Sequence, residues 1–375
     1  MTISLPFTRP TLDEATIQDV AEVLRSSWVA SGPKVLQFEA ALSDYCGGRP
    51  VRVLNHATAA LEIALRVCDI GPGDEVITPA LSFVATANVI VRAGARPVFV
   101  DVDLDTRNVD LDQVEAAIGP STRAIMPVHF AGLPVDMDRL YAIARRHELR
   151  VIEDAAHAIG SSWQGRRIGS FGDLTCFSFQ ANKNITSIEG GAIAGGSASD
   201  IASIERQRFH GLVKSGPDQF EVFEAATKAN MSDVNACVGL AQLQRLEAFN
   251  ARRRQLAARY FERWSQNPPV RLPAHGDSGH SWHLFAPLLP LELLGITRLG
   301  FIEAMAARGI GVGVHYPAIH LFAAYRAMGY REGQFPNAER IGRETVTLPL
   351  FPGMELRDVD RVVEATAASI VDARI

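Results

Sequence analysis

The sequence predicts an α/β fold made of a large α/β/α domain with a mostly parallel mixed sheet and a smaller C-terminal α+β domain. Strand-like and helix-like segments alternate through the first two-thirds of the 375 residues, as in a parallel sheet with helices on both faces. Pro268, Pro269 and Pro273 then interrupt the chain before a second set of elements. Because the chain is also long for one domain, we expect domains of residues 1–249 and 250–375.

Short apolar runs predict the strands of the large domain. They lie at residues 50–55, 75–79, 97–101, 123–129, 150–153, 174–179 and 191–195. Apolar spacing and polar caps predict helices at 61–68, 82–92 and 136–147, and one that begins at residue 111 after the cap Asp110. A loop that carries Lys183 is expected to join the last two strands.

The rest of the chain predicts mainly helices. A long helix is expected at residues 232–264, and its basic run Arg252, Arg253 and Arg254 is typical of a solvated helix face. The smaller domain is expected to contain strands near 282–289 and 311–316, a helix near 297–308 and a final helix from about residue 356.

Composition excludes several classes of protein. The net charge of −5 gives no basic excess for a nucleic-acid partner. The longest uncharged stretch, residues 76–91, is too short and polar for a membrane span, and the N-terminus does not resemble a signal peptide. The four cysteines, Cys46, Cys68, Cys176 and Cys237, form no CxxC pair, so we expect buried thiols in the cytoplasm.

The strongest local signal for chemistry is the segment 178–191, SFQANKNITSIEGG. It places Lys183 in a polar loop just after an apolar strand. A lysine amine forms a Schiff base with an aldehyde once burial or nearby cations favour its neutral form. Taken alone, such a lysine is usually an ordinary surface residue.

A second signal is the segment 151–157, VIEDAAH, in which a strand ends at Asp154. Open α/β sheets bind ligands at the carboxyl ends of their strands, and a carboxylate there can pair with a protonated pyridine nitrogen. The alternative is an aspartate that caps the next helix.

A third signal is the segment 55–60, NHATAA, between the first strand and its helix. Helix N-termini bind phosphate through free N–H groups, and Thr58 could add a hydroxyl. A plain helix cap is the alternative. The chain has no GxGxxG, P-loop, HExxH or GxSxG motif, and no spacing of residues suggests a metal site.

Together these segments resemble the DegT-type sugar aminotransferases, a branch of the fold-type I enzymes that use pyridoxal 5′-phosphate (PLP). The likeness runs from about Ser27 to Pro352. Its motifs are WVASGPK at 28–34, DEVITP at 74–79, VIEDAAH at 151–157, FSFQANKNITSIEGG at 177–191 and MSDVNACVGLAQLQ at 231–244.

The resemblance implies roles for single residues. Lys183 matches the Schiff-base lysine, and Asp154 matches the acid that pairs with the pyridine nitrogen. The other implied cofactor contacts are Thr58 and Ala59 in the phosphate-binding turn, Phe83 stacked on the ring, His157 beside the ring, Ser178 on the phosphate, and Asn230, which reaches the phosphate from the neighbouring subunit of a homodimer. Lys34, His315 and Tyr316 are expected near the substrate.

The chain departs from the family pattern at two places. Ala226–Ala229 stands where a Gly-Tyr-x-Tyr segment is usual, and Ile188 replaces a small residue. Relatives with histidine in place of the lysine are dehydratases, and Lys183 therefore argues against that chemistry.

The resemblance implies transfer of an amino group from glutamate to a keto carbon, expected to be C4, of a nucleotide-linked sugar. The likeness is greatest to enzymes that aminate a UDP-4-keto-pentose, although HYPAIHL at 315–321 and FPNA at 335–338 are more similar to enzymes for 4-keto-6-deoxy-hexosamines. A dTDP-sugar, a non-catalytic PLP or nucleotide-sugar binding protein, and an amino-acid aminotransferase with Arg52, Arg208 or Arg326 as carboxylate ligand are the alternatives.

Overall fold

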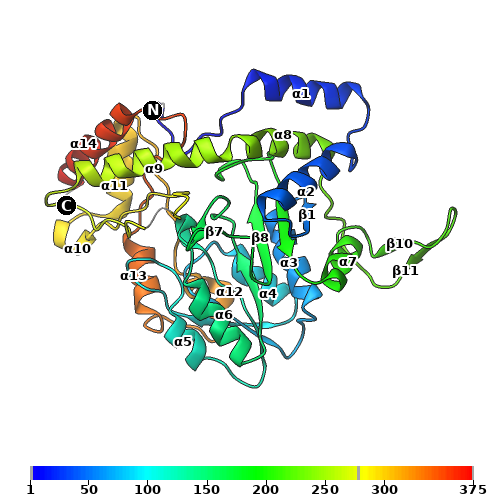
Figure 1. The fold of residues 1–375 in the computed structure, drawn as a ribbon. Coiled ribbons are helices and arrows are strands. Elements are labelled where there is room, and N and C mark those ends of the chain that lie inside the picture. Colours follow the sequence, from blue (N-terminus) through cyan, green and yellow to red (C-terminus); the bar gives the residue numbers. More distant parts are fainter. Residues whose placement is uncertain (1–2, 277–278, 374–375) are drawn as a thin grey trace.

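A seven-stranded sheet in the order β1-β9-β8-β5-β4-β2-β3 forms the centre of the chain (Figure 1). The structure is a computed structural model that describes residues 3–276 and 279–373. Strand β9 runs antiparallel to both of its neighbours, whereas the pairs from β8 to β3 are parallel, which confirms the predicted mixed sheet. The strands are β1 (Val51–Leu54), β2 (Glu75–Pro79), β3 (Arg96–Val100), β4 (Thr122–Ile125), β5 (Arg150–Asp154), β8 (Leu174–Ser178) and β9 (Gly191–Gly195).

Helices cover both faces of this sheet, because neighbouring strand residues point to opposite sides and both sides are apolar. Val151 packs with α2, α5, α6 and α8, and Ile152 packs with α3, α4 and α7. These helices are α2 (Pro33–Tyr45), α3 (Ala57–Val67), α4 (Ala85–Arg92), α5 (Leu111–Ala116), α6 (Met137–Arg146), α7 (Ala198–Gln207) and α8 (Asp233–Gln244).

Polar side chains set several helix ends. Asp110 accepts hydrogen bonds from the N–H groups of Asp112 and Gln113 and begins α5 as predicted. Helix α2 begins differently, because buried Asp233 of α8 accepts from the backbone N–H groups of Gly32, Lys34 and Val35. One carboxylate therefore fixes α2 to α8. Helix α1 (Glu14–Arg25) packs on α8 as well.

The C-terminal part of the chain has its own apolar core. Tyr260 and Phe285 stack there with ring centroids 4.4 Å apart. Leu5 joins this core and pairs with Ile310, so the N-terminal segment crosses to the C-terminal part. The helices of this part are α9 (Leu246–Arg263), α10 (Leu291–Leu294), α11 (Arg298–Ala307), α12 (Ala323–Arg326), α13 (Pro336–Glu344) and α14 (Leu356–Asp372). Helix α9 runs across the predicted domain boundary at residue 249, and the division remains a prediction.

Four expectations for the elements are wrong, three of them in or near the C-terminal part and one at α4. Segments 282–289 and 311–316 form isolated bridges rather than strands, because Pro287 has no N–H to donate and the bridging residues pair with different parts of the chain. The predicted helix 232–264 is two helices, since the backbone at Arg245 (φ −100°, ψ −4°) interrupts the hydrogen-bond ladder. The helix expected from residue 82 begins at Ala85, because residues 82–84 form the preceding turn.

Two side chains lie differently from the prediction. Cys68 is half-buried, whereas the other three cysteines are buried as expected. Arg253 does not face solvent: it is 2% exposed, and its guanidinium donates to the carbonyl of Leu350 at 2.7 Å and, over longer distances, to those of Trp282 and His283. Burial lowers the pKa of Arg253 to about 10, so the group remains a cation inside the protein.

Two short hairpins lie outside the central sheet. Strands β6 (Ser162–Trp163) and β7 (Arg166–Arg167) form one of them. Strands β10 (Leu212–Lys214) and β11 (Phe220–Val222) form the other, which projects from the body of the molecule at the right of Figure 1. In the described part of the chain, no helix combines the length and apolar character that a membrane span requires.

We predict that Arg253→Met destabilises the protein by about 2 kcal/mol, because it leaves buried carbonyl groups without donors. Urea denaturation followed by circular dichroism measures the change. The matched control is Arg254→Met, since the side chain of Arg254 is half-exposed and makes no hydrogen bond or ion pair among the described residues; its effect should stay within about 0.5 kcal/mol. Equal stability of the two variants would contradict the buried role of Arg253.

Candidate active site

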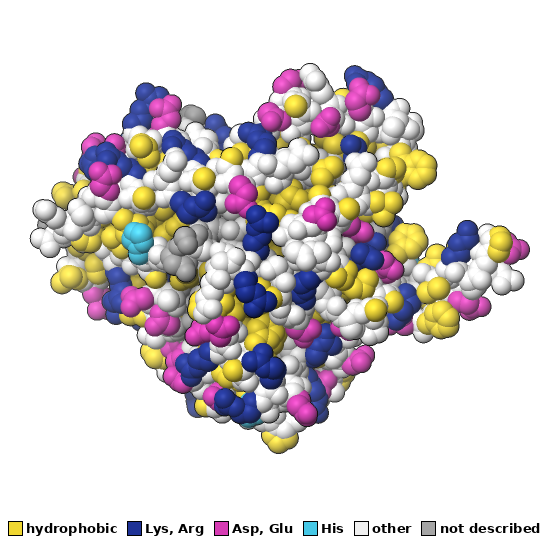
Figure 2. Space-filling view, in the orientation of Figure 1, with side chains coloured by type: hydrophobic (Ala, Val, Ile, Leu, Met, Phe, Trp, Pro, Cys, Tyr) yellow, Lys and Arg dark blue, Asp and Glu magenta, His cyan; other side chains and the backbone are white. Residues whose placement is uncertain are grey.

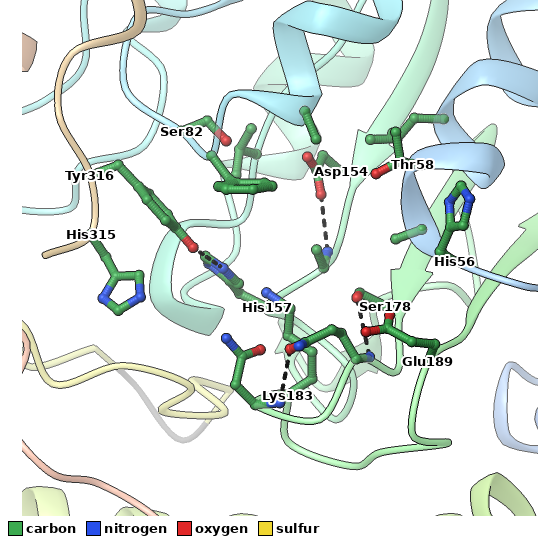
Figure 3. Close-up of a pocket in the computed structure, with 18 residues that line it drawn as sticks. His56, Thr58, Ser82, Asp154, His157, Ser178, Lys183, Glu189, His315 and Tyr316 are labelled. Carbon is green, nitrogen blue, oxygen red and sulfur yellow. Dashed lines mark hydrogen bonds between the residues drawn. The ribbon is translucent and has the colours of Figure 1, made fainter. Parts of the chain in front are cut away.

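A cavity of about 330 Å³ lies at the carboxyl ends of the parallel strands (Figure 3). Strand β5 ends there with Asp154 and strand β8 with Ser178, and the N-terminus of α3 brings Thr58 to the same place. The residues that line it are His56, Ala57, Thr58, Leu61, Ser82, Phe83, Ala85, Val128, Asp154, Ala156, His157, Ser178, Gln180, Asn182, Lys183, Glu189, His315 and Tyr316. The topology thus brings together segments that are more than 250 residues apart.

Lys183 lies in the loop between β8 and β9 and lines the cavity. No hydrogen bond holds its amine among the described residues. Burial lowers the pKa of Lys183 to about 8, and the nearby carboxylate of Asp154 opposes this shift. A substantial fraction of the amine is therefore neutral near physiological pH, as nucleophilic or acid–base chemistry requires.

The Lys183 loop is fixed by its next residue. The amide of buried Asn184 donates to Asn250 of α9 at 2.8 Å and to the carbonyl of Ser281 at 3.0 Å. The same side chain bonds to Nδ1 of His283 at 3.0 Å. Since both amide hydrogens of Asn184 are used, its oxygen is the acceptor and His283 carries a proton on Nδ1. The loop is therefore bound to two segments of the C-terminal part.

Asp154 presents its carboxylate to the cavity from the end of β5. Its Oδ2 accepts from the hydroxyl of Thr86 at 2.8 Å, and its Oδ1 accepts from the N–H of Ala156 at 3.1 Å. Burial raises the pKa of Asp154, while these hydrogen bonds and Lys183 act in the opposite direction. A buried carboxylate with two fixed donors is suited to a cationic partner in the cavity.

The N-terminus of α3 forms another wall of the cavity. Nδ1 of His56 caps this helix by accepting from the N–H of Ala59 at 2.9 Å, while the side chain of Thr58 lies at the cavity. Ser178, 5% exposed, lies at the cavity as well. Two hydroxyls beside the positive end of a helix are suited to a phosphate group.

His157 and Tyr316 are joined by a hydrogen bond of 3.1 Å, drawn as a dashed line in Figure 3. Nδ1 of His157 accepts from the N–H of Ala131 at 3.3 Å, and burial lowers the pKa of this imidazole far enough to keep it neutral. Its proton therefore lies on Nε2 and is donated to the phenol oxygen. Burial raises the pKa of Tyr316, so the phenol keeps its own proton for a ligand.

Two more predicted residues lie at the cavity. The ring of Phe83 is 5.7 Å from that of Tyr316 and is partly exposed. Nδ1 of His315 bonds to the hydroxyl of Thr347 at 2.7 Å, and burial lowers the pKa of His315 to about 4. At neutral pH, His315 therefore presents no positive charge to the cavity.

Ala59, Lys34 and Asn230 do not line the cavity of their own chain, and the N–H of buried Ala59 donates to His56. The amide of Asn230 bonds to the hydroxyl of Ser31 and to the amine of Lys228. Lys34 follows the first residue of α2. The structure thus brings most of the predicted residues together, while the role of Asn230 in a neighbouring subunit and the substrate role of Lys34 stay predictions.

Sequence reasoning missed several polar groups at the site. Thr86, which holds Asp154, gave no local signal because the two are 68 positions apart in the sequence. His56, Ser82, Gln180, Asn182 and Glu189 also line the cavity. Four of these five lie within or beside the predicted motifs, so a search of the whole motif for polar side chains could have found them.

These groups fit pyridoxal 5′-phosphate. The buried amine of Lys183 can react with an aldehyde, and Asp154 can pair with a protonated pyridine nitrogen. The end of α3 with Thr58 and Ser178 suits the phosphate, and Phe83 offers an aromatic face to a flat ring.

Comparison with known proteins supports this interpretation. Residues 10–367 match the DegT/DnrJ/EryC1/StrS aminotransferase family. The spore coat polysaccharide biosynthesis protein SpsC of Bacillus subtilis is 41% identical over 372 residues, which cover 96% of each chain. The PLP form of the putative sugar aminotransferase Spr1654 from Streptococcus pneumoniae is 33% identical, with a TM-score of 0.92 over 99% of this chain and 100% of that one.

A second solved structure is similar over nearly the same length. PseC of Helicobacter pylori, an aminotransferase involved in the biosynthesis of pseudoaminic acid, is 28% identical with a TM-score of 0.93, over 98% of this chain and 99% of that one. The family match and these neighbours agree with the geometry of the cavity. The chain therefore belongs to the DegT/DnrJ/EryC1/StrS aminotransferase family, as a sugar aminotransferase with the fold-type I architecture and pyridoxal 5′-phosphate as its cofactor.

Proposed function

We propose that this chain transfers the amino group of glutamate to the C4 keto carbon of a UDP-linked ketosugar. The observation that carries the proposal is the buried amine of Lys183, close enough to the carboxylate of Asp154 for the two charges to interact. The product would be an amino sugar for a glycan such as lipopolysaccharide. We place the reaction in the cytoplasm, since the four described cysteines are free thiols.

Each of the two groups has a separate task. Pyridoxal 5′-phosphate, when bound, supplies an electron sink for the carbon that loses a proton. The amine of Lys183 would carry a proton away from the donor carbon and return a proton to the sugar carbon. A pKa of about 8 suits this role, because the amine can both accept and give a proton near neutral pH. Asp154 keeps the pyridine nitrogen protonated by pairing with it.

The polar lining suits a sugar as the acceptor. No arginine is among the described residues that line this cavity, so the carboxylates of glutamate or of any amino-acid acceptor would need neutral donors here or groups from the partner subunit. Arg52 and Arg208 are paired elsewhere, with Glu205 and Glu39, and Arg326 does not line the cavity. Hydroxyl, amide and imidazole groups such as Ser82, Gln180, Asn182, His315 and Tyr316 can instead bond to sugar hydroxyls.

We also propose a homodimer with shared active sites. Apolar side chains are exposed on and near α1 and α2 and on the hairpin β10–β11, which appear in yellow at the upper right and right of Figure 2. They include Ile17, Leu24, Trp28 and Leu36 on the first surface and Phe220, Val222 and Phe223 on the second. Exposed apolar groups in such number indicate a protein interface. Asn230, whose amide bonds to Ser31 beside the first surface, would reach the partner's phosphate site.

The first prediction concerns the titration of Lys183. In the cofactor-free protein, labelling of this amine with acetic anhydride should rise with pH to a midpoint of about 8, because only the neutral amine reacts. Asp154→Asn should move the midpoint down, since the carboxylate stabilises the ammonium form. Peptide mass spectrometry reads the result, and Lys34, Lys214 and Lys228, the other three lysines of the chain, serve as internal references. A midpoint for Lys183 near 10.5, the ordinary lysine value, would contradict its burial.

The second prediction concerns the reaction. With glutamate as donor, the holoenzyme should convert a UDP-4-ketosugar to an aminosugar, seen by mass spectrometry as the amino product and 2-oxoglutarate. The panel compares UDP-4-keto-pentose, UDP-linked 4-keto-6-deoxy-hexosamine and dTDP-linked 4-keto-6-deoxy sugars. Lys183→Ala should abolish turnover and the visible absorbance of the lysine-bound cofactor.

The same assay, extended to other amino donors and to 2-keto acids as acceptors, separates the alternatives. If no amino donor changes the spectrum of the yellow holoprotein, the chain is a binding protein rather than an enzyme. If 2-keto acids accept the amino group and every ketosugar fails, it is an amino-acid aminotransferase. Preference for dTDP-linked substrates would overturn the assignment of UDP as the nucleotide and leave the proposed amino transfer to a ketosugar unchanged.

The third prediction concerns the shared site. Lys183→Ala and Asn230→Ala should each be inactive, or nearly so, as a pure protein. After subunit exchange, the mixture should recover about a quarter of the wild-type rate, because half of randomly mixed dimers are hybrids with one intact site. Sedimentation velocity checks for the dimer. A monomer at micromolar concentration, or no recovery on mixing, would reject the proposal.

A further inference from the structure

His283 contacts two groups of the active site, although it is not among the described residues that line the cavity. The residue is 4% exposed. Its Nδ1 donates to the side-chain oxygen of Asn184, the residue after Lys183, at 3.0 Å. The face of its imidazole packs against that of His157, with ring centroids 4.4 Å apart and an interplanar angle of 32°. One side chain of the C-terminal part therefore touches both the loop of the reactive amine and a histidine of the cavity wall.

The segment 281–283 also holds the surroundings of His157. The N–H of His283 donates to the carbonyl of Ala131 at 2.8 Å, and the N–H of Ala131 donates to Nδ1 of His157. The hydroxyl of buried Ser281 donates to the carbonyl of His157 at 3.1 Å. Gly132, with a φ of 92°, permits this close approach, because a Cβ there would clash with the hydroxyl of Ser281. The segment thus fixes the backbone of His157 and the N–H group that binds its ring.

His283 is a neutral imidazole in this position. Burial lowers its pKa far below the ordinary histidine value, and His157 and the cations Lys183 and Arg253 act in the same direction. Its single proton lies on Nδ1, where it is donated to Asn184. His283 therefore supports the loop through a fixed donor and adds no charge beside the amine of Lys183.

We propose that His283 is a positioning residue for the amino transfer, which fixes the loop of Lys183 relative to His157 and so sets the place and the hydration of the amine. An amine that moves a proton must be held close to the carbon atom, and a displacement of about 1 Å can lower a rate about a hundredfold. The motifs that carry Lys183 and His157 do not contain this support, since His283 lies 99 positions from Asn184 in the sequence. The inference rests on the proposed role of Lys183, and one of its tests needs neither cofactor nor substrate.

Three substitutions separate the donor of His283 from its ring. His283→Asn keeps an amide N–H at the position of Nδ1 and removes the ring. His283→Phe keeps a ring against His157 and leaves the oxygen of Asn184 without its donor. His283→Gln moves the amide N–H one bond further, to the position of Nε2. The matched control is Tyr260→Phe, which also keeps a ring and removes one buried hydrogen bond, to the carbonyl of Pro349 in the C-terminal core.

The first test labels the full chain without cofactor. The acetic anhydride midpoint of Lys183 should rise by about 1 pH unit or more in His283→Phe and His283→Gln, because a looser loop admits water to the amine. His283→Asn and Tyr260→Phe should keep the midpoint of about 8.

The second test mixes the holoenzyme with glutamate and follows the loss of its visible absorbance. The maximal rate of His283→Phe should fall about 10- to 100-fold, while the glutamate concentration for half of that rate stays within about threefold. His283→Asn should lie between this variant and wild type, since it restores the donor without the ring. Tyr260→Phe should react like wild type.

A wild-type midpoint and rate in His283→Phe would overturn the proposal. Equal midpoints in His283→Asn and His283→Gln would reject the hydrogen bond to Asn184 as the cause, and an equal rise in Tyr260→Phe would assign the change to a general loss of stability. If His283→Phe fails to fold, the comparison of the Asn and Gln variants decides. A wild-type holoenzyme that no amino donor changes would reject the proposed function, whereas the labelling midpoints report on the support of the loop by themselves.

Discussion

The amine of Lys183 is buried beside a carboxylate, and much of the surrounding structure serves to keep it there. Water would stabilise its charged form, and burial removes that water. The chain compensates only in part, through the charge of Asp154, so that the amine loses its proton close to neutral pH. The hydrogen bonds that anchor Asn184, the next residue, therefore have a chemical purpose. A looser loop would expose Lys183 to water, raise its pKa toward the ordinary lysine value and so reduce the neutral, reactive fraction of the amine.

The same principle applies to the hydrogen-bonded groups around the cavity. His157 is neutral because it is buried, and the N–H of Ala131 decides which of its nitrogens carries the proton. That choice makes Tyr316 an acceptor toward the protein and leaves its proton for a ligand. The positions of the protons on His157 and Tyr316 are thus fixed before a ligand binds. Such preorganisation costs nothing at the moment of reaction, because the fold has already oriented these groups.

The sequence allows the parts that depend on local order to be predicted. Asp154 and Ser178 end buried strands, and Thr58 lies in the first turn of a helix after a strand, so the edge at which they meet follows from the alternation of elements. Contacts between distant segments cannot be predicted in this way. Thr86 reaches Asp154 across 68 positions, and Tyr316 reaches His157 across 159. Neither pair leaves a trace in local spacing.

Arg253 is a second residue whose contacts could not be predicted from the local sequence. Its neighbours in a basic run suggest solvent, yet a helix turns by about 100° per residue, and only one of three consecutive side chains points to the core here. Which one does so depends on the packing of α9, and the apolar pattern of this helix is weak. The isolated bridges of the C-terminal part are similar, since Pro287 interrupts a run that otherwise reads as a strand.

Asn250 and Arg253 have a joint consequence, because they lie three positions apart and so on one side of α9. The first side chain bonds to the loop of Lys183, and the second to carbonyl groups of the C-terminal core. Any rotation of one part of the chain against the other would pull on the loop of Lys183 through α9 and through the bonds of Asn184 to Ser281 and His283. Helix α9 therefore links the position of the Lys183 loop to the packing of the C-terminal core.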